Sequence, residues 1–571
     1  MTSTRRIAVV GAGPAGTALA VGLLRAGHEV TLVSDRTAEE IRRGAVMSSQ
    51  VTFESALEAE SVLGVTALLP EAPPLGRMSY TTRRADGSGS SFSTALPTPA
   101  RSLDQRVRVP LLLEEVERRG GKVVVRSATP DDLDDLARDH DLVVVSTGRG
   151  GLTSLFPRDE DRSPYDVPQR VAALTYLHGV APDPDGPGLR YHCVEGVGEC
   201  FTCPALSVDG PCDIVVVEGV PGGPLDVWDD VTTPEQHLAV LRDALAAHFP
   251  EEAERVAGAT LVEGGTLRGA ITPVVRRPVG RLPSGAPVLG MADVVVLNDP
   301  LTSQGANNAT KSASFYLEAV LAHRGPFDAD WMQRTFDNFW RGWAQWATAW
   351  TTSWLRPALP HQREVIDAAG VVPAVAEQVA AGFDDARLFH PWWFDPDAAA
   401  VFLEEQRTAQ ASGFDPGDLR RALGQYATGV TVVTTTDDEG RPFGMTANSF
   451  TSVSLSPPLV LWAAARSSPS TPAFDAAPRF AVNVLASDQH HLSRQFSTSG
   501  GDKFEGVRLV EHDLPLLEGT VARFVCRRTQ RIDAGDHVLY LGEIEDYDAS
   551  GGEPLVFHSG FYRLATRHPD L

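Results

Sequence analysis

The run Gly11-Ala12-Gly13-Pro14-Ala15-Gly16, directly after the apolar residues 6–10, decides the fold of the first part of this chain. Residues 6–10 are typical of a buried parallel strand, and the glycine run then opens a helix. The first glycine permits a tight turn, the second lets the backbone approach a pyrophosphate, and the third lets helix and strand pack closely. The alternative is a fortuitous glycine turn, but the flanking strand and helix favour a dinucleotide-binding loop.

The residues after this loop continue a strand-helix-strand unit. Residues 17–26 have a helical pattern, and residues 29–33 form a second apolar run. In dinucleotide sites an acidic residue about 20 positions beyond the loop binds the ribose hydroxyls. Asp35 lies near that position, and its neighbours Ser34 and Arg36 are further candidates for binding the cofactor.

The rest of the chain divides into segments of different pattern. We expect helices at 106–119, 131–138, 234–248 and 418–426, strands at 122–125, 142–145, 287–291 and 430–435, a helix beginning near Thr310, and mainly helical structure over 326–385. These elements predict an α/β Rossmann-type domain over 1–170 and 276–325, an antiparallel-sheet substrate domain over 171–275, a helical segment over 326–390, a linker over 391–414 and an all-β domain, typical of a small barrel, over 415–571.

Composition limits the classes of partner. The chain has 571 residues, 43% of them hydrophobic and 22% charged, and its formal net charge of −24 follows from 50 basic and 74 acidic residues. A surface this acidic repels nucleic acid and anionic membranes. No run of about 18 uninterrupted apolar residues is present, so we expect no membrane span and a cytoplasmic enzyme with small-molecule ligands.

The five cysteines do not indicate a disulfide framework, because their number is odd and their density low. Cys200 and Cys203 have C-x-x-C spacing, which redox and metal sites also use. No second such pair and no tight histidine pair accompany them. We therefore interpret them as reduced cysteines in a strand, and we expect no metal.

The pattern Gly290-x-x-Asp293, followed by Asp299-Pro300-x-x-x-Gln304-Gly305-Ala306-Asn307, resembles the second FAD motif of flavoprotein monooxygenases. Backbone amides that open a helix here can face a flavin ring, where negative charge accumulates on reduction. The alternative, an ordinary polar turn before a helix, is disfavoured by the length of the pattern. The first 390 residues contain no second G-x-G-x-x-G, and Ser146-Thr147-Gly148 lacks the Asp-Gly of single-component aromatic hydroxylases. This half is therefore expected to receive flavin already reduced.

These motifs, with Arg101-Ser-Leu-Asp104-Gln-Arg106, Ser163-Pro164 and Pro168-Gln169-Arg170, resemble the styrene/indole monooxygenase family over most of residues 5–325. The resemblance implies an FAD-dependent oxygenase that epoxidises a vinyl or indole C=C bond through a C4a-hydroperoxyflavin. It also implies that Arg106 and the second motif contact FAD. Such a transfer needs an apolar, water-poor pocket rather than a strong protein acid or base.

The segment after the second strand lies beside the flavin in that family, and here it reads Ser48-Ser49-Gln50-Val51-Thr52. Styrene-favouring members carry Asn, Val and His at the positions matching 48, 50 and 52. Ser48 and Gln50 resemble the indole-favouring branch and are the substrate candidates. Thr52 stands where Met is expected, and Ala45 stands where many members have Arg.

Trp340, Trp343, Trp346, Trp350 and Trp354 recur at three- and four-residue steps, which places them on one broad face of a helix. They could line an aromatic substrate pocket or form a packing stripe against the FAD domain. The packing interpretation is the more common use of such a stripe.

Two further motifs lie near the C-terminus. Thr446-Ala447-Asn448-Ser449-Phe450-Thr451-Ser452 combines small residues with hydroxyl and amide groups that bind phosphate and flavin, and Gly535-Asp536-His537 follows later. With Phe480-Ala-Val-Asn483 and Phe561-Tyr562-Arg563, they resemble the short-chain NADH:flavin oxidoreductases over about 415–565. The resemblance implies a split barrel, flavin contacts at Thr446, Ala447, Asn448, Ser449 and Ser452, and nicotinamide contacts at Gly535, Asp536 and the catalytic candidate His537. The alternative for His537 is an ordinary loop histidine.

The leading hypothesis is a self-sufficient monooxygenase. One domain reduces FAD with NADH, and the other uses reduced FAD and O2 to epoxidise indole or a styrene-type alkene. The resemblance to dimeric reductases implies a homodimer through the reductase domain and leaves a separate oxygenase component open. Two alternative hypotheses remain. One is a fused hydroxylase that acts on another aromatic compound or an amine, and the other is a flavin reductase whose N-terminal half stores flavin or regulates the reductase.

Overall fold

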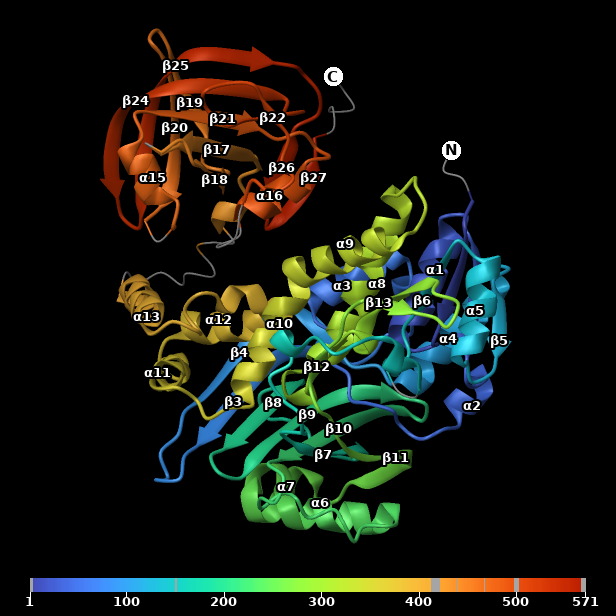
Figure 1. The fold of residues 1–571 in the computed structure, drawn as a ribbon. Helices are drawn as coiled ribbons and strands as arrows, with labels where there is room; N and C mark the ends of the chain where they lie inside the picture. Colours follow the sequence, from blue (N-terminus) through green and yellow to red (C-terminus); the bar gives the residue numbers. More distant parts are fainter. Residues whose placement is uncertain are drawn as a thin grey trace, which may run out of the picture. The chain divides into compact units, whose positions relative to one another are not determined.

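The computed structural model divides the chain into two units, residues 1–408 and 409–571. It describes residues 4–148, 151–411, 419, 422–437, 439–466, 468–497 and 503–565. Figure 1 shows the course of the chain within each unit.

The first sheet of the N-terminal unit is built on the opening strand. Its order is β13-β14-β6-β1-β2-β5. The neighbouring strands from β14 to β5 in this order are all parallel. The strands are β1 Arg6–Val10, β2 Glu29–Ser34, β5 Lys122–Val125, β6 Leu142–Val145, β13 Val279–Arg281 and β14 Pro287–Gly290. β1 and β6 are apolar almost throughout because both faces of these central strands are covered. The Rossmann-like start that the glycine loop predicts is confirmed.

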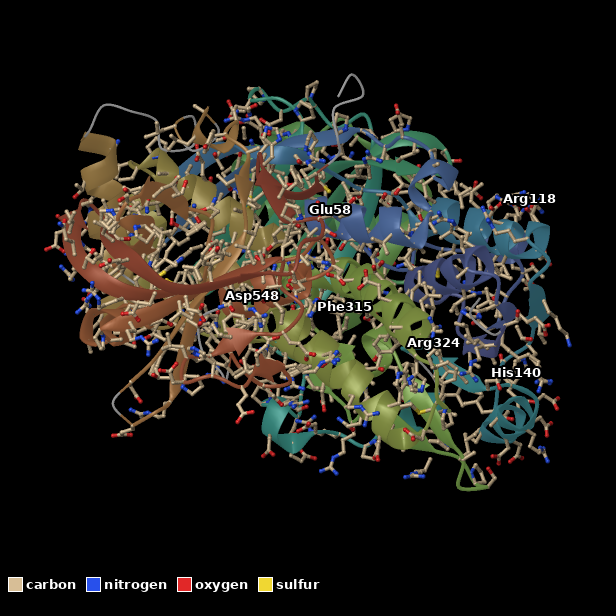
Figure 2. All side chains as sticks on the ribbon, turned by 90° about the horizontal axis from the view of Figure 1, so that it is seen from above. Glu58, Arg118, His140, Phe315, Arg324 and Asp548 are labelled. Atoms are coloured by element: carbon tan, nitrogen blue, oxygen red, sulfur yellow. The ribbon has the colours of Figure 1, made fainter. Side chains whose placement is uncertain are left out.

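Helices α1 Pro14–Arg25, α3 Glu54–Leu63, α4 Gln105–Arg118 and α8 Gln304–Ala322 belong to this layer. α1 packs against α4 and α8, and α8 packs against α3. Figure 2 shows Glu58 on α3 and Phe315 on α8. The short helices α2 Ala38–Arg42 and α5 Pro130–Asp139 complete this half. α8 begins six residues before the expected start near Thr310, because Ser303 adopts a left-handed conformation (φ 57°) that turns the chain into the helix.

The second sheet has the order β11-β7-β10-β9-β8-β3-β4. Its strands are β3 Pro74–Arg83, β4 Ser91–Arg101, β7 Val171–His178, β8 Gly188–Val194, β9 Gly198–Ser207, β10 Gly210–Gly219 and β11 Thr260–Ala270. Two features differ from the expected antiparallel sheet over 171–275. β3 and β4 come from earlier in the chain, and β3 pairs with β8 in parallel. Their weak alternation, broken by prolines in β4, gave no strand signal in the sequence.

The two faces of this sheet carry different helices. Ile214 and Val216 face a core shared with α10 Gln345–Trp354, α11 Pro360–Ala369 and α12 Pro373–Asp384. Val215 and Val217 face a core shared with α6 Pro234–His248 and α7 Pro250–Val256. Figure 1 shows α6 and α7 against the outer face of this sheet. The alternation follows from the two-residue period of a strand.

The tryptophan series does not follow one face. After α9 Ala329–Phe339, the helix makes one π turn over Trp340–Ala344, which rotates the residues that follow it. Trp343 packs in the core of the first sheet, whereas Trp350 is fully buried against the second sheet. The Trp350 ring centroid lies 4.7 Å from that of Phe383. The series therefore packs against both layers.

The expected linker over 391–414 is wrong for most of its length. Residues 396–411 form α13 (Pro396–Ala411), and Trp392, Trp393, Ala399 and Leu403 are buried in the core of the N-terminal unit. The Pro-Asp and alanine-rich composition that suggested a linker here makes a helix start and a small packing face. Residues 412–414 lie outside the described residues.

The C-terminal unit is built on one antiparallel sheet of order β18-β17-β21-β24-β25-β20-β19, with a smaller sheet β16-β26-β27. The strands are β16 Thr428–Gly429, β17 Thr431–Thr436, β18 Pro442–Ala447, β19 Thr451–Leu455, β20 Pro458–Ala465, β21 Arg479–Val484, β24 Ala522–Ala534, β25 His537–Ala549, β26 Leu555–His558 and β27 Phe561–Leu564, with helices α15 Thr471–Ala476 and α16 His490–Ser497. The two-residue strands β22 Leu509–Val510 and β23 Leu516–Leu517 also pair in this unit. In the N-terminal unit, the two-residue strands β12 Val274–Val275 and β15 Val296–Leu297 pair in the same way. Of the helix expected at 418–426, residues 419 and 422–424 are helical and 425–426 form a turn, whereas 418, 420 and 421 lie outside the described residues.

Within the described ranges, no single helix is long and apolar enough to cross a membrane, although the bent pair α11–α12 passes that test together by length and composition.

Glu252 on α7 fastens the outer helices to the second sheet. Its carboxylate is fully buried and accepts from Arg190 (2.6 Å), Arg255 (2.6 Å) and His192 (2.9 Å). Burial alone would raise the pKa of Glu252. The hydrogen bond from His192 and the charges of the two arginines outweigh burial and lower it to about 2. The ionised carboxylate is therefore the form that the fold stabilises.

Replacing Glu252 with Gln should destabilise the protein by about 3–5 kcal/mol at neutral pH, because the mostly covered Arg255 and Arg190 both lose a fully buried carboxylate, and only Arg190 keeps a further one in Asp183. Since the folded pKa lies below the unfolded one, the stabilisation is present above about pH 4.5 and is lost as pH falls towards 2. Calorimetric unfolding of both proteins between pH 3.5 and 7.5 would show the difference shrinking on acidification. Glu251→Gln, at the exposed neighbour, is the matched control. A pH-independent difference would contradict this assignment.

Candidate functional site

The carboxyl ends of β1, β6 and β14 bring the predicted motifs of the N-terminal unit to one edge of the sheet. Gly11 has φ +113°, and a Cβ built on Gly16 would lie 2.0 Å from the Gly11 carbonyl oxygen. The third glycine of the loop is therefore required for the contact between α1 and β1. A Cβ on Gly148, just after β6, would lie 2.7 Å from Cβ of Asp293. The glycine loop, the end of β6 and the start of the second motif thus converge.

The N-terminus of α1 is open. Gly13 is its N-cap and supplies no side-chain hydrogen bond, Pro14 occupies the first turn, and nothing lies within 4 Å of a Cβ built on Gly13. The first amides of a helix carry partial positive charge and lack intrahelical partners. This cradle fits the pyrophosphate of a dinucleotide such as FAD.

The residues expected at the ribose lie just after β2. The Ser34 hydroxyl is buried and donates to the Arg36 carbonyl at 2.5 Å. The Asp35 side chain is 65% exposed and lies 3.6 Å from the Arg36 guanidinium. Asp35 is thus the accessible carboxylate at this edge, whereas Ser34 holds the turn that presents it.

The start of α8 is the second open helix end. Ser303 caps it without a side-chain hydrogen bond, and nothing lies within 4 Å of a Cβ built on Gly305. Asn307, in the first turns, is fully buried: its amide nitrogen donates to the Val51 carbonyl (2.8 Å) and its oxygen accepts from the Phe53 amide (3.0 Å). Gln304 donates to the carbonyls of Thr302 and Phe383. These two amides therefore fasten the helix start to neighbouring segments.

The segment 48–52 lies between the two layers. The Ser48 hydroxyl accepts from Gln105 at 2.7 Å, and the Ser48 carbonyl accepts from the Tyr176 hydroxyl of the second sheet at 3.2 Å. Gln50 is buried, and its amide pairs with the Leu103 carbonyl (3.0 Å) and the Gln105 amide (3.1 Å). The polar atoms of both substrate candidates are thus engaged by the protein and set the path of this segment.

Arg106 is buried and tied to protein partners. Its guanidinium pairs with Asp104 at 2.8 Å and donates to the Glu263 carbonyl at 2.7 Å and the Gly44 carbonyl at 3.3 Å. Arg106 therefore joins α4 to the turn at Gly44 and to the irregular stretch of β11 at Glu263.

Cys200 and Cys203 cannot form a disulfide with each other in this fold. They lie three positions apart on β9, so they point to opposite faces of the sheet and pack in different cores. Burial raises the pKa of Cys203 to about 12, which keeps its thiol protonated. All five cysteines are free.

In the C-terminal unit, Gly535 and Asp536 form the two-residue turn of the β24–β25 hairpin, and His537 begins β25. The His537 ring lies 2.8 Å from the Asp536 carboxylate and is 44% exposed. Arg466, which the sequence did not single out, donates to the carbonyls of Gly535 and Asp536 at 2.9 Å each. No local pattern marks Arg466 in the sequence, because it precedes the turn by 69 residues.

The loop after β18 flanks the same strand. The Ser449 hydroxyl bonds the amide and carbonyl of Ala463 on β20, and Ala465 of that strand pairs with His537. Strand spacing and rise then place the loop and the histidine within about 12 Å of each other. The Thr446 hydroxyl donates to the Ser493 carbonyl at 2.6 Å, whereas Asn448 and Ser452 are exposed. The two motifs of this unit therefore border one end of β20.

Three family models match the chain. Residues 6–65 match "NADP oxidoreductase coenzyme F420-dependent", residues 148–255 match "Styrene monooxygenase A putative substrate binding domain", and residues 423–565 match "Flavin reductase like domain". The first supports the Rossmann-like start, and the other two define the class: a flavoprotein in which an oxygenase-like part precedes a flavin reductase.

Individual relatives agree with this division. FMN reductase (NADH) SmoA of Agrobacterium fabrum is 44% identical over 29% of this chain and 97% of its own length. A flavin reductase of Pseudomonas putida is 41% identical over 26% of this chain and 91% of its own. Styrene monooxygenase StyA of Pseudomonas fluorescens is 29% identical over 56% of this chain and 78% of its own. The chain belongs to the flavin reductase family through its C-terminal unit, which is joined to a styrene monooxygenase-like part; flavin and a nicotinamide are its cofactors.

Substitutions in the glycine loop should separate packing from ligand binding. Gly16→Ala should destabilise the protein by about 1–3 kcal/mol, because its methyl group meets the Gly11 carbonyl. Gly13→Ala should leave the unfolding temperature unchanged and reduce oxygenated product from chemically reduced FAD, because its methyl group projects into the open space before α1. Oxidation of the nicotinamide cofactor, expected of the flavin reductase-like unit, is the internal control. Equal unfolding temperatures for the two variants would contradict the packing role of Gly16.

Proposed function

We propose that this chain is a self-sufficient flavin-dependent monooxygenase. The C-terminal unit reduces FAD with NADH, and the N-terminal unit takes up the reduced FAD and, with O2, epoxidises indole or a styrene-type aromatic alkene. The observation that carries the proposal is the occurrence in one chain of an open dinucleotide cradle at α1 and a reductase-type hairpin at Gly535–His537. The names of the relatives, a styrene monooxygenase and an NADH-dependent flavin reductase, support the same division of labour.

In the N-terminal unit, Gly11–Gly16 and Ser34–Arg36 would hold the dinucleotide part of FAD, and the start of α8 at Gln304–Asn307 would face its ring. Bound reduced FAD would supply the activation of O2. The protein itself supplies an apolar surrounding, in which Tyr80, Tyr191 and Trp354 pack with ring centroids 5.5–5.8 Å apart. An apolar wall of this kind limits the access of water to a reactive oxygen species.

In the C-terminal unit, residues 446–452 would bind the flavin and His537 would contact the nicotinamide, oriented by Asp536. The hydrogen bond from His537 lowers the pKa of Asp536, so the carboxylate form holds the ring. We also propose that the unit closes as a split barrel and pairs with a second copy. Val453 and Leu455 on β19 are apolar side chains that are 51% and 94% exposed, and a second copy would cover them.

Aerobic turnover with NADH, FAD and indole tests the proposal directly. An indole-plus-oxygen mass, formed in step with NADH oxidation, is the expected result. Parallel reactions with styrene and with a phenol separate epoxidation from aromatic hydroxylation. NADH oxidation that yields only hydrogen peroxide with every substrate would overturn the oxygenase role and favour a flavin-storing or regulatory N-terminal unit.

His537→Ala should lower NADH oxidation by about 10²–10⁴-fold, the range expected when a positioned catalytic group is lost. The same variant should still form product when chemically reduced FAD is supplied, because the N-terminal unit is unchanged. His491→Ala, an exposed histidine of the same unit, is the matched control. Loss of both activities in His537→Ala would contradict separable half-reactions.

A further inference from the structure

Four ionisable side chains lie buried together between the second sheet and the second flavin motif. They are Arg170 just before β7, Glu199 on β9, Glu218 on β10 and Asp299 just before the 3-10 turn Pro300–Thr302, with exposures of 8%, 5%, 0% and 1%. One cation thus accompanies three carboxyl groups. The oxygenase role proposed above does not use this cluster directly.

The single cation is already committed. The Arg170 guanidinium forms two hydrogen bonds with the Glu199 carboxylate, both 2.9 Å long. A bidentate pair of this kind keeps both partners ionised. Glu218 and Asp299 are therefore left without a cation of their own among the residues that the structure describes.

Backbone register brings like groups face to face. Glu218 is the direct cross-strand partner of Glu199 in the β9–β10 ladder, so the two side chains stand on the same face of the sheet. Directly opposed like charges are destabilising, and more so without solvent. Neither carboxyl oxygen of Glu218 has a hydrogen-bond partner among conventional donors of the described residues, and one oxygen of Asp299 lacks one too.

The two orphan carboxyl groups are neighbours, and each acts on the ionisation of the other. Two carboxyl groups can bond only when one of them carries a proton. Burial raises the pKa of Glu218 well above its usual value, and burial also raises that of Asp299, to about 6. The charged groups that act on the pair are Arg170 and Glu199.

Asp299 connects this pair to the turn before α8. Its second oxygen accepts from the Leu301 amide at 3.1 Å, and the Leu301 carbonyl accepts from the buried Tyr191 hydroxyl of β8. The turn leads through Ser303 into Gln304, where α8 begins. The ionisation of a pair buried under the second sheet is thereby linked to the helix start that would face the flavin.

We propose that Glu218 and Asp299 share one proton and act as positioning residues, holding the turn Pro300–Gln304 against the second sheet only while that proton is present. The proposal rests on the oxygenase role of the N-terminal unit. When the proton is lost at alkaline pH, two adjacent carboxylates repel each other without a counter-ion, and the turn loosens. The yield of oxygenated product per reduced FAD should then fall, with hydrogen peroxide formed instead.

The first test observes the proton itself. The infrared spectrum of the full chain at pH 7 should contain the C=O band of a protonated, buried carboxyl group, and Glu218→Gln should lack it. Because the folded pKa is raised, the pair costs the wild type stability progressively from about pH 4.5 upward through the raised pKa. Glu218→Gln keeps a donor for Asp299 and cannot ionise, so it should unfold at a higher temperature than wild type at pH 9. Absence of the band, or an alkaline stability no higher than wild type, would overturn the proposal.

The second test observes the turn. Full-length protein receives chemically reduced FAD, O2 and indole, without NADH, between pH 6 and 9. Product yield from the wild type should fall by up to roughly tenfold per pH unit above the pKa of the pair, whereas that from Glu218→Gln should stay flat. Glu199→Gln, which strands Arg170, should be destabilised at every pH. Asp299→Asn provides a second variant with the expected flat profile.

A fall of equal steepness in Glu218→Gln and wild type would overturn the proposal. Absence of product from every protein at every pH would overturn the oxygenase role instead. The infrared band would then still test whether Glu218 and Asp299 share a proton.

Discussion

The contact between Gly16 of α1 and the Gly11 carbonyl is the constraint on which the N-terminal site depends. A side chain at position 16 would need space that the backbone already occupies, with 2.0 Å to the carbonyl oxygen. This closeness places the first turn of α1 at the carboxyl edge of the parallel sheet, beside the end of β6. The charge of the helix end and the open space before Gly13 then coincide at one point. In the proposed site, an anionic dinucleotide would be held by the helix end and this open space rather than by a charged side chain.

The second sheet is joined to this edge by a few buried hydrogen bonds of large sequence separation. Asn307 of α8 holds the backbone of segment 51–53, and Tyr191 of β8 holds the Leu301 carbonyl of the turn before α8. Each of these donors is buried, where leaving a partner unpaired costs about 1–3 kcal/mol. The helix start and segment 48–52 are thus positioned by both layers together. These hydrogen bonds would fix the distance between a substrate on the second sheet and a flavin at the start of α8.

The sequence predicted the elements whose signal is local. The apolar strands β1 and β6 and the helix Pro234–His248 were expected at the bounds where they lie, with the glycine loop directly after β1. The reductase assignment of the C-terminal unit was likewise carried by short motifs, and the family comparison confirms it. The strands β3 and β4 were missed because their burial depends on β8, about 100 residues later. The linker was misplaced because composition alone cannot show that Leu403 packs in a core. The role of Arg466 at the hairpin turn is equally a product of long-range pairing.

Two buried glutamates of the N-terminal unit show that burial alone does not decide the charge of a side chain. Glu252 and Glu218 are both fully buried. Burial would raise the pKa of Glu252, but His192 and two arginines outweigh it and lower the pKa to about 2. Burial raises the pKa of Glu218, and the nearby Asp299 raises it further, because Arg170, the one arginine beside it in the described part of the chain, is bound to Glu199. The first glutamate therefore stabilises the fold as an anion, on the outer face of the sheet. Glu218 is favoured in its protonated form, and it lies where the second sheet meets the turn into α8. Glu218 costs stability when it is ionised, and it lies beside the turn Pro300–Gln304 that leads into α8. In our proposal the position of that turn therefore depends on pH, whereas Glu252 on the outer face has no such connection to α8.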